Sequence, residues 1–101
     1  MSINTRLSSS GHEATISISG RFDFSQHQDF RSAFDKAPAA IKQFVVDLRA
    51  TEYVDSSALG MLLVLRDKVG DQRDNVKIIN ANASVRKILE IANFDKLFSV
   101  V

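Results

Sequence analysis

Asp55, Ser56 and Ser57 place one carboxylate and two hydroxyls directly in front of a strongly apolar run. Aspartate and serine are favoured N-cap residues, because their side-chain oxygen accepts a hydrogen bond from the first turn of a helix, and Asp55 or Ser56 could fill that position. Capping requires only one such residue. The other interpretation is a regulatory phosphoserine at Ser56, since the N–H groups and the dipole at a helix N-terminus tolerate an added anion.

Asp23, in the segment GRFDF, is a second acidic candidate. It could cap a helix that begins near Phe24. In the functional interpretation, its carboxylate lies on the same edge of a sheet as Ser56. The residues alone leave both interpretations open.

The run that follows the hydroxyls is apolar on almost every side. Its first turns contain Ala58, Leu59, Met61, Leu62, Leu63, Val64 and Leu65. A surface helix needs only one apolar stripe, so this helix is either sandwiched between a sheet and other helices or exposes part of its start to a partner. Under the second interpretation, Ala58 and Met61 join the candidate docking residues.

Enzymatic motifs are weak in this chain. There is no G-x-S-x-G nucleophile elbow, and the two histidines, His12 and His27, lie in an expected turn and on an expected helix. The segment SVRK, residues 84–87, matches S-x-x-K, but so short a pattern arises readily by chance. Phosphate-binding glycine motifs and clustered metal ligands are also missing from the sequence, so we expect no catalysis, no cofactor and no metal site.

The hydrophobic pattern predicts alternating strands and helices. Alternation over Glu13–Gly20 indicates a half-buried strand, and three- to four-residue spacing over Phe24–Lys36 indicates an amphipathic helix. The other expected elements are an edge strand (Ile3–Ser9), a central strand (Phe44–Leu48), a loop (Ala50–Val54), a helix (Ser56–Val69), a strand (Val76–Ile79), a helix (Ala83–Ala92) and a final turn around Phe94, Leu97 and Phe98.

The order β-β-α-β-α-β-α predicts a single α/β domain over residues 1–101. We expect a mixed sheet of about four strands, parallel in its second half because helical crossovers join those strands, with three to four helices. Sites in such sheets gather beyond the carboxyl ends of the strands. The segment from Asp55 to Ser57 lies on that edge in this arrangement.

Composition narrows the classes of partner. The formal net charge is only +1, which gives no strong field for binding nucleic acid or an anionic membrane. The chain has no cysteine, which fits a reducing compartment. Its N-terminal segment lacks the apolar core of a signal peptide, and its apolar stretches are far shorter than the roughly 20 residues of a spanning helix. We therefore expect a cytoplasmic protein.

Three segments carry a family resemblance. The segments ISGRFDF, FVVDLRATEYVDSSALGMLLVL and NANASVRKILEIANFDKLF together resemble a STAS domain of the bacterial anti-sigma factor antagonist family, along essentially the whole chain. The common family motif is D-S-S/T-G-L-G, and its first serine corresponds to Ser56. Ala58 stands where glycine is usual in that motif. Asp23 matches an acidic position beside the phosphorylation site.

The resemblance implies a STAS-type fold and a protein-binding switch without catalytic activity. Unphosphorylated, such a protein binds an anti-sigma factor through residues near Asp23 and Ser56 and so frees a sigma factor. A serine kinase, which can be the anti-sigma factor itself, phosphorylates Ser56 and ends binding. A PP2C-type phosphatase, alone or within a response regulator, resets the cycle. The alternative is a STAS module that controls another partner, such as a cyclase or a stressosome-like assembly.

Overall fold

The computed structural model describes residues 3–38, 40–70 and 73–101. In these ranges, five strands form one sheet in the order β1-β2-β3-β4-β5, together with three α-helices and three short 3-10 helices. The elements in chain order are β1 (Ile3–Leu7), β2 (Glu13–Phe22), η1 (Phe24–Gln26), α1 (His27–Asp35), β3 (Gln43–Val54), α2 (Ser56–Val69), η2 (Arg73–Asn75), β4 (Val76–Ile79), α3 (Ala83–Ile91), η3 (Phe94–Lys96) and β5 (Ser99–Val100).

The sheet is mixed, as the order of elements predicts. β1 pairs antiparallel with β2, whereas β2–β3, β3–β4 and β4–β5 are parallel pairs. The expected edge strand is therefore confirmed, although it ends at Leu7 rather than Ser9. Parallel pairing brings the carboxyl ends of β2 and β3 to the same edge of the sheet.

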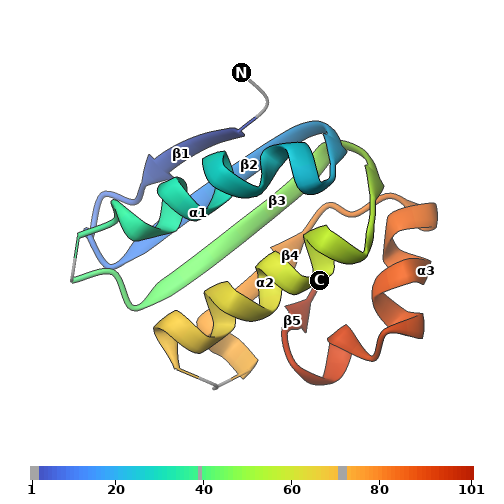
Figure 1. Cartoon of the computed structure of the whole chain (residues 1–101). Helices are drawn as coiled ribbons and strands as arrows, with labels where there is room; N and C mark the ends of the chain where they lie inside the picture. Colours follow the sequence, from blue (N-terminus) through green and yellow to red (C-terminus); the bar gives the residue numbers. More distant parts are fainter. Residues whose placement is uncertain (1–2, 39, 71–72) are drawn as a thin grey trace.

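Helices cover one face of this sheet. α1 and α2 lie side by side across it, and α3 stands at one end, next to the carboxyl end of β3 (Figure 1). Ile16 of β2 is completely buried, while its neighbours Thr15 and Ser17, on the opposite face of the strand, are half-buried. This two-sided pattern confirms the alternation in the β2 sequence, because successive side chains of a strand point to opposite faces.

The loop predicted over Ala50–Val54 is wrong, because β3 continues to Val54. β2 likewise passes through Gly20 and continues to Phe22, with two shifts of register that keep it paired with β3. Gly20 has a φ of +79°, which glycine adopts without strain. Because the pairing is irregular here, buried and exposed residues do not alternate regularly. The strand ends expected from the sequence depended on that alternation.

Thr51 ties this irregular stretch together. Its hydroxyl is buried and donates a hydrogen bond to the Ile18 carbonyl oxygen at 2.7 Å. The Asn82 side-chain amide donates to the Thr51 carbonyl oxygen at 3.2 Å, which links the start of α3 to β3. A buried polar group needs such partners, so these contacts hold the last residues of β3 in place.

Two other boundaries differ from the expected ones. The segment predicted as one helix from Phe24 to Lys36 divides into η1 and α1. The final turn around Phe94 is confirmed as η3, but a short fifth strand, Ser99–Val100, follows it. β5 has only two residues, too few for a hydrophobic period to reveal it.

Aromatic packing fixes α1 against the end of β2. The Phe30 ring lies 5.1 Å from the Phe22 ring and 5.6 Å from the Phe34 ring, measured between centroids. All three side chains are buried. Because Phe22 is the last residue of β2, this cluster also positions Asp23, which follows it.

Two kinds of feature are missing from the described ranges. They hold no helix whose length and apolar character would let it cross a membrane. They also hold no group of three or more histidine, cysteine or acidic side chains placed to bind a metal ion.

Candidate functional site

The candidate site lies where β2 and β3 end. Phe22 and Val54 are partners in the parallel register, so Asp23 and Asp55 follow at neighbouring positions on the same edge. The Asp55 amide donates a hydrogen bond to the Phe22 carbonyl oxygen at 3.3 Å, which joins the two strand ends directly. The structure therefore brings Asp23 and the segment around Ser56 together.

Asp55 fills the capping position at the start of α2. Its Oδ1 accepts a hydrogen bond from the Ala58 amide at 2.8 Å, and its backbone is extended, as an N-cap requires. Of the two residues proposed as caps, Asp55 is thus the one used. Ser56 becomes the first residue inside the helix.

This arrangement leaves the Ser56 side chain available. Ser56 is exposed and its hydroxyl makes no hydrogen bond to any residue that the structure describes, whereas Ser57 is half-buried. The amides of the first helical turn have no carbonyl partner within the helix, so they give the Ser56 position a positive electrostatic environment. Among the adjacent hydroxyls, Ser56 is the better placed for a modifying enzyme.

Asp23 is held in a network of its own. It caps η1: Oδ1 accepts hydrogen bonds from the Ser25 amide at 3.0 Å and from the Ser25 hydroxyl at 2.5 Å. Oδ2 lies 3.4 Å from Nε of Arg21, and the Arg21 guanidinium carbon lies 4.4 Å from the centre of the Tyr53 ring. The carboxylate is therefore fixed in position at the edge of the site.

The same contacts favour the ionised form of Asp23. The Ser25 hydroxyl contributes most, with the Ser25 amide and Arg21 behind it, and together they lower the pKa of the Asp23 carboxyl despite partial desolvation. A lowered pKa means that the charged form is stabilised above the ordinary pKa and that this stabilisation is lost as the pH falls through the lowered value. The edge of the sheet that holds Ser56 therefore also presents a fixed negative charge.

The burial of individual residues shows which sides of the apolar helix α2 are covered. Ala58, Met61, Leu62 and Leu65 are buried against the core. Leu63 and Val64 are 37% and 43% exposed, so the helix is neither fully sandwiched nor fully open. The side chains of the predicted docking residues Ala58 and Met61 have little or no solvent-exposed surface. They pack into the core and so hold the start of α2 in position.

Phe24 is an exposed residue next to Asp23 whose position sequence reasoning missed. The spacing placed it on the buried face of a helix with His27 and Phe30, but Phe24 is 70% exposed and only Phe30 of the three is buried. The cause is η1, because a 3-10 helix has about 3.0 residues per turn and shifts Phe24 out of phase with the α-helical stripe. Its ring instead stacks on the exposed His27 ring at 5.8 Å.

The S-x-x-K serine lies elsewhere. Ser84 is exposed in the first turn of α3, and Asn82 caps that helix by accepting a hydrogen bond from the Val85 amide at 2.8 Å. The interpretation of Ser84 as a first-turn residue is confirmed. Ser84 is therefore the second residue of a capped helix, whereas Ser56 is the first residue of one.

Comparison with known proteins gives both family and fold. The family model described as "Mlab, STAS domain" matches residues 5–101. The STAS-domain containing protein PA14_20770 of Pseudomonas aeruginosa (strain UCBPP-PA14) is 49% identical over 100 residues, which cover 99% of each chain.

Solved structures share the architecture at low identity. An anti-sigma factor antagonist from Mycobacterium paratuberculosis is 22% identical with a TM-score of 0.74, over 98% of this chain and 85% of that one. The anti-sigma factor antagonist SpoIIAA in its unphosphorylated form is 15% identical with a TM-score of 0.70, over 93% and 96%. Phosphorylated SpoIIAA of Bacillus is 13% identical with a TM-score of 0.67, over 98% and 90%.

These structures establish the fold, and the family rests on the sequence. The family model spans nearly the whole chain, and the STAS-domain relative from Pseudomonas aeruginosa matches it from end to end. The chain belongs to the STAS domain family.

Proposed function

We propose that the protein is an anti-sigma factor antagonist whose binding is switched off by phosphorylation of Ser56. The observation that carries the proposal is the exposed Ser56 hydroxyl at the N-terminus of α2, next to the fixed carboxylate of Asp23. The existence of SpoIIAA structures in unphosphorylated and phosphorylated forms supports this kind of switch for the fold.

The docking surface in this proposal is the edge formed by Asp23, Phe24, Asp55, Ser56 and Ser57. Phe24 supplies an exposed aromatic side chain, the type that most often anchors a protein interface. Asp23 supplies a charge that selects a basic complement. Unphosphorylated, this surface binds the anti-sigma factor and thereby frees a sigma factor.

Phosphorylation acts on the partner rather than on the fold. A phosphate at Ser56 projects from the helix into the interface, where an unpaired dianion is costly to bury. A serine kinase, which can be the anti-sigma factor itself, supplies ATP and Mg²⁺, and a PP2C-type phosphatase, alone or in a response regulator, restores the hydroxyl. The protein needs no cofactor of its own, catalyses nothing, and acts in the cytoplasm.

Affinity capture from the cells that produce the protein tests the function. Ser56→Ala protein, which stays unmodified, should recover an anti-sigma factor, whereas Ser56→Asp protein should recover much less of it. Equal recovery by the two variants would refute the switch. Selective recovery of a cyclase or a stressosome-like assembly would instead support a STAS module with another output.

A further inference from the structure

Gly60 is a glycine in the interior of a helix. It lies in the second turn of α2, which has 14 residues, and it is exposed. Glycine is unfavourable in a helix interior, because it loses more conformational freedom on folding than alanine does. A glycine at such a position therefore needs a reason, either within the fold or outside it.

The fold gives no reason for this glycine. Gly11, Gly20 and Gly70 have positive φ values, whereas Gly60 keeps the negative φ of a regular helix. Outside its own helix, no heavy atom of the described residues lies within 4 Å of the place where a Cβ atom of residue 60 would be. α1 lies beside α2 but leaves this position open (Figure 1). An alanine would therefore fit here without displacing any described neighbour.

Gly60 lies on the same face of α2 as Ser56. Residues four apart in a helix are neighbours on its surface, so Gly60 follows directly below the exposed serine. Leu63 and Val64 continue this face in the next turn and are 37% and 43% exposed. The exposed surface of α2 thus passes from a hydroxyl, across a helix backbone without a side chain, to two apolar side chains.

We propose that Gly60 is the point at which the anti-sigma factor approaches α2 most closely, with an apolar segment of that partner resting on the bare helix between Ser56 and Val64. This inference rests on the proposed function and adds a contact to its docking surface. Glycine allows another chain to come close to a backbone, because no Cβ atom stands between them. The glycine makes the helix less stable and the complex more stable.

The chemistry at Ser56 identifies the occupant. Phosphorylation joins Oγ of Ser56 to the γ-phosphorus of ATP, breaks the bond from that phosphorus to ADP, and passes the hydroxyl proton to a base of the kinase. The reacting atoms must come within about 3.5 Å of each other. Gly60 is only about 6 Å from Ser56 along the helix. An anti-sigma factor that phosphorylates Ser56 therefore also covers Gly60.

Substitution of Gly60 should change stability and binding in opposite directions. Gly60→Ala should raise the midpoint of thermal unfolding by about 3 to 6 °C, as measured by circular dichroism. By calorimetry with the purified anti-sigma factor, the same substitution should weaken binding at least about fivefold, and the longer side chain of Gly60→Gln should weaken it at least about 50-fold. A loss of folded protein cannot cause both results.

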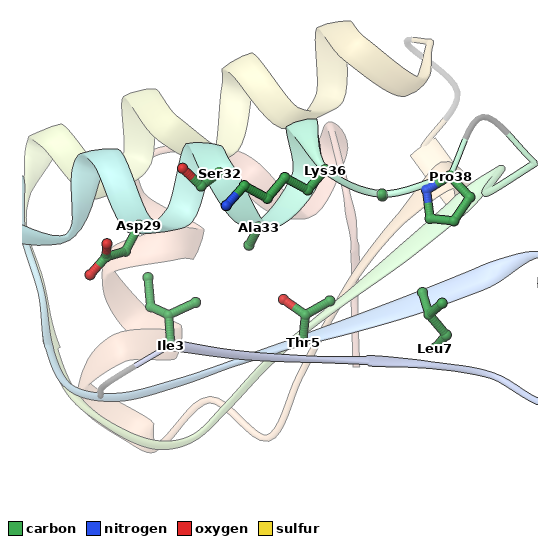
Figure 2. Close-up of a pocket in the computed structure, with 9 residues that line it drawn as sticks. Ile3, Thr5, Leu7, Asp29, Ser32, Ala33, Lys36 and Pro38 are labelled. Atoms are coloured by element: carbon green, nitrogen blue, oxygen red, sulfur yellow. The ribbon is translucent and has the colours of Figure 1, made fainter.

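Two controls separate the position from the kind of change. Ser32→Ala also replaces a residue with a better helix former, but Ser32 lines the groove between α1 and β1 and not the side of α1 that faces α2 (Figure 2). Ala83→Gln adds a long side chain at an exposed position of α3. Both controls should leave the affinity within about twofold of the unmodified protein.

The outcomes distinguish this inference from the function on which it rests. Unchanged affinity in both Gly60 variants, with binding still weakened by Ser56→Asp, would overturn the contact at Gly60 and leave the switch in place. A lower unfolding midpoint in Gly60→Ala would also overturn it, because the fold itself would then require the glycine. Equal binding by Ser56→Ala and Ser56→Asp protein would refute the switch, and the inference with it.

Discussion

Phosphoserine installed at position 56 should weaken binding of the protein to its captured partner by about 100-fold or more, which corresponds to roughly 2.8 kcal/mol. The helix dipole favours the phosphate by only about 0.3 to 1 kcal/mol. Burying an unpaired dianion in an interface costs several kcal/mol. The unfavourable contribution therefore dominates.

Isothermal titration calorimetry with the purified partner measures this effect. The matched control is phosphoserine at Ser84, which is also exposed in the first turn of a capped helix but on α3. The control should leave the affinity within about threefold of the unmodified protein, or roughly 0.65 kcal/mol, because Ser84 lies on α3 and is not part of the proposed docking surface. Equal losses at Ser56 and Ser84 would mean that added charge, and not its position at the site, decides binding.

Phe30→Ala should lower the free energy of unfolding by about 3 to 5 kcal/mol, a large part of the roughly 5 to 15 kcal/mol typical of a domain. Phe30 is fully buried and packs between Phe22 and Phe34, so truncation removes apolar burial and leaves a cavity. The same loss loosens the end of β2. Chemical denaturation monitored by circular dichroism measures the change.

Phe24→Ala supplies the matched control, because it removes the same side chain from a position that is 70% exposed. We expect its stability to remain within about 0.5 kcal/mol of the unmodified protein. Equal destabilisation by the two substitutions would contradict the division between a core Phe30 and a surface Phe24. A loss of partner binding in Phe24→Ala, with stability kept, would further support its place in the docking surface.

Local patterns predicted the elements that have a strong period. α2 is found over Ser56–Val69 and β4 over Val76–Ile79, as expected, because caps and apolar runs mark their ends. The full extent of β3 was not predictable in this way. Its last residues pair with β2 across shifts of register, and such pairing depends on residues distant in the sequence.

The candidate site was partly predictable for a similar reason. Asp23 and Ser56 could be brought to one edge because the carboxyl ends of parallel strands coincide, and Ser56 stood out as a hydroxyl beside a capping aspartate. The exposure of Phe24 was not predictable, because one 3-10 turn at the start of α1 changes which face its ring occupies. The burial of Ala58 and Met61 likewise depends on how α2 lies against the sheet.

Mapping phosphate on the protein isolated from the cells that produce it tests the central claim most directly. Tandem mass spectrometry should locate a single phosphate on Ser56, absent from Ser56→Ala protein and retained in Ser57→Ala protein. Phosphate that persists in Ser56→Ala protein at the same level would contradict the account, because the exposed hydroxyl at the start of α2 would then not be the acceptor.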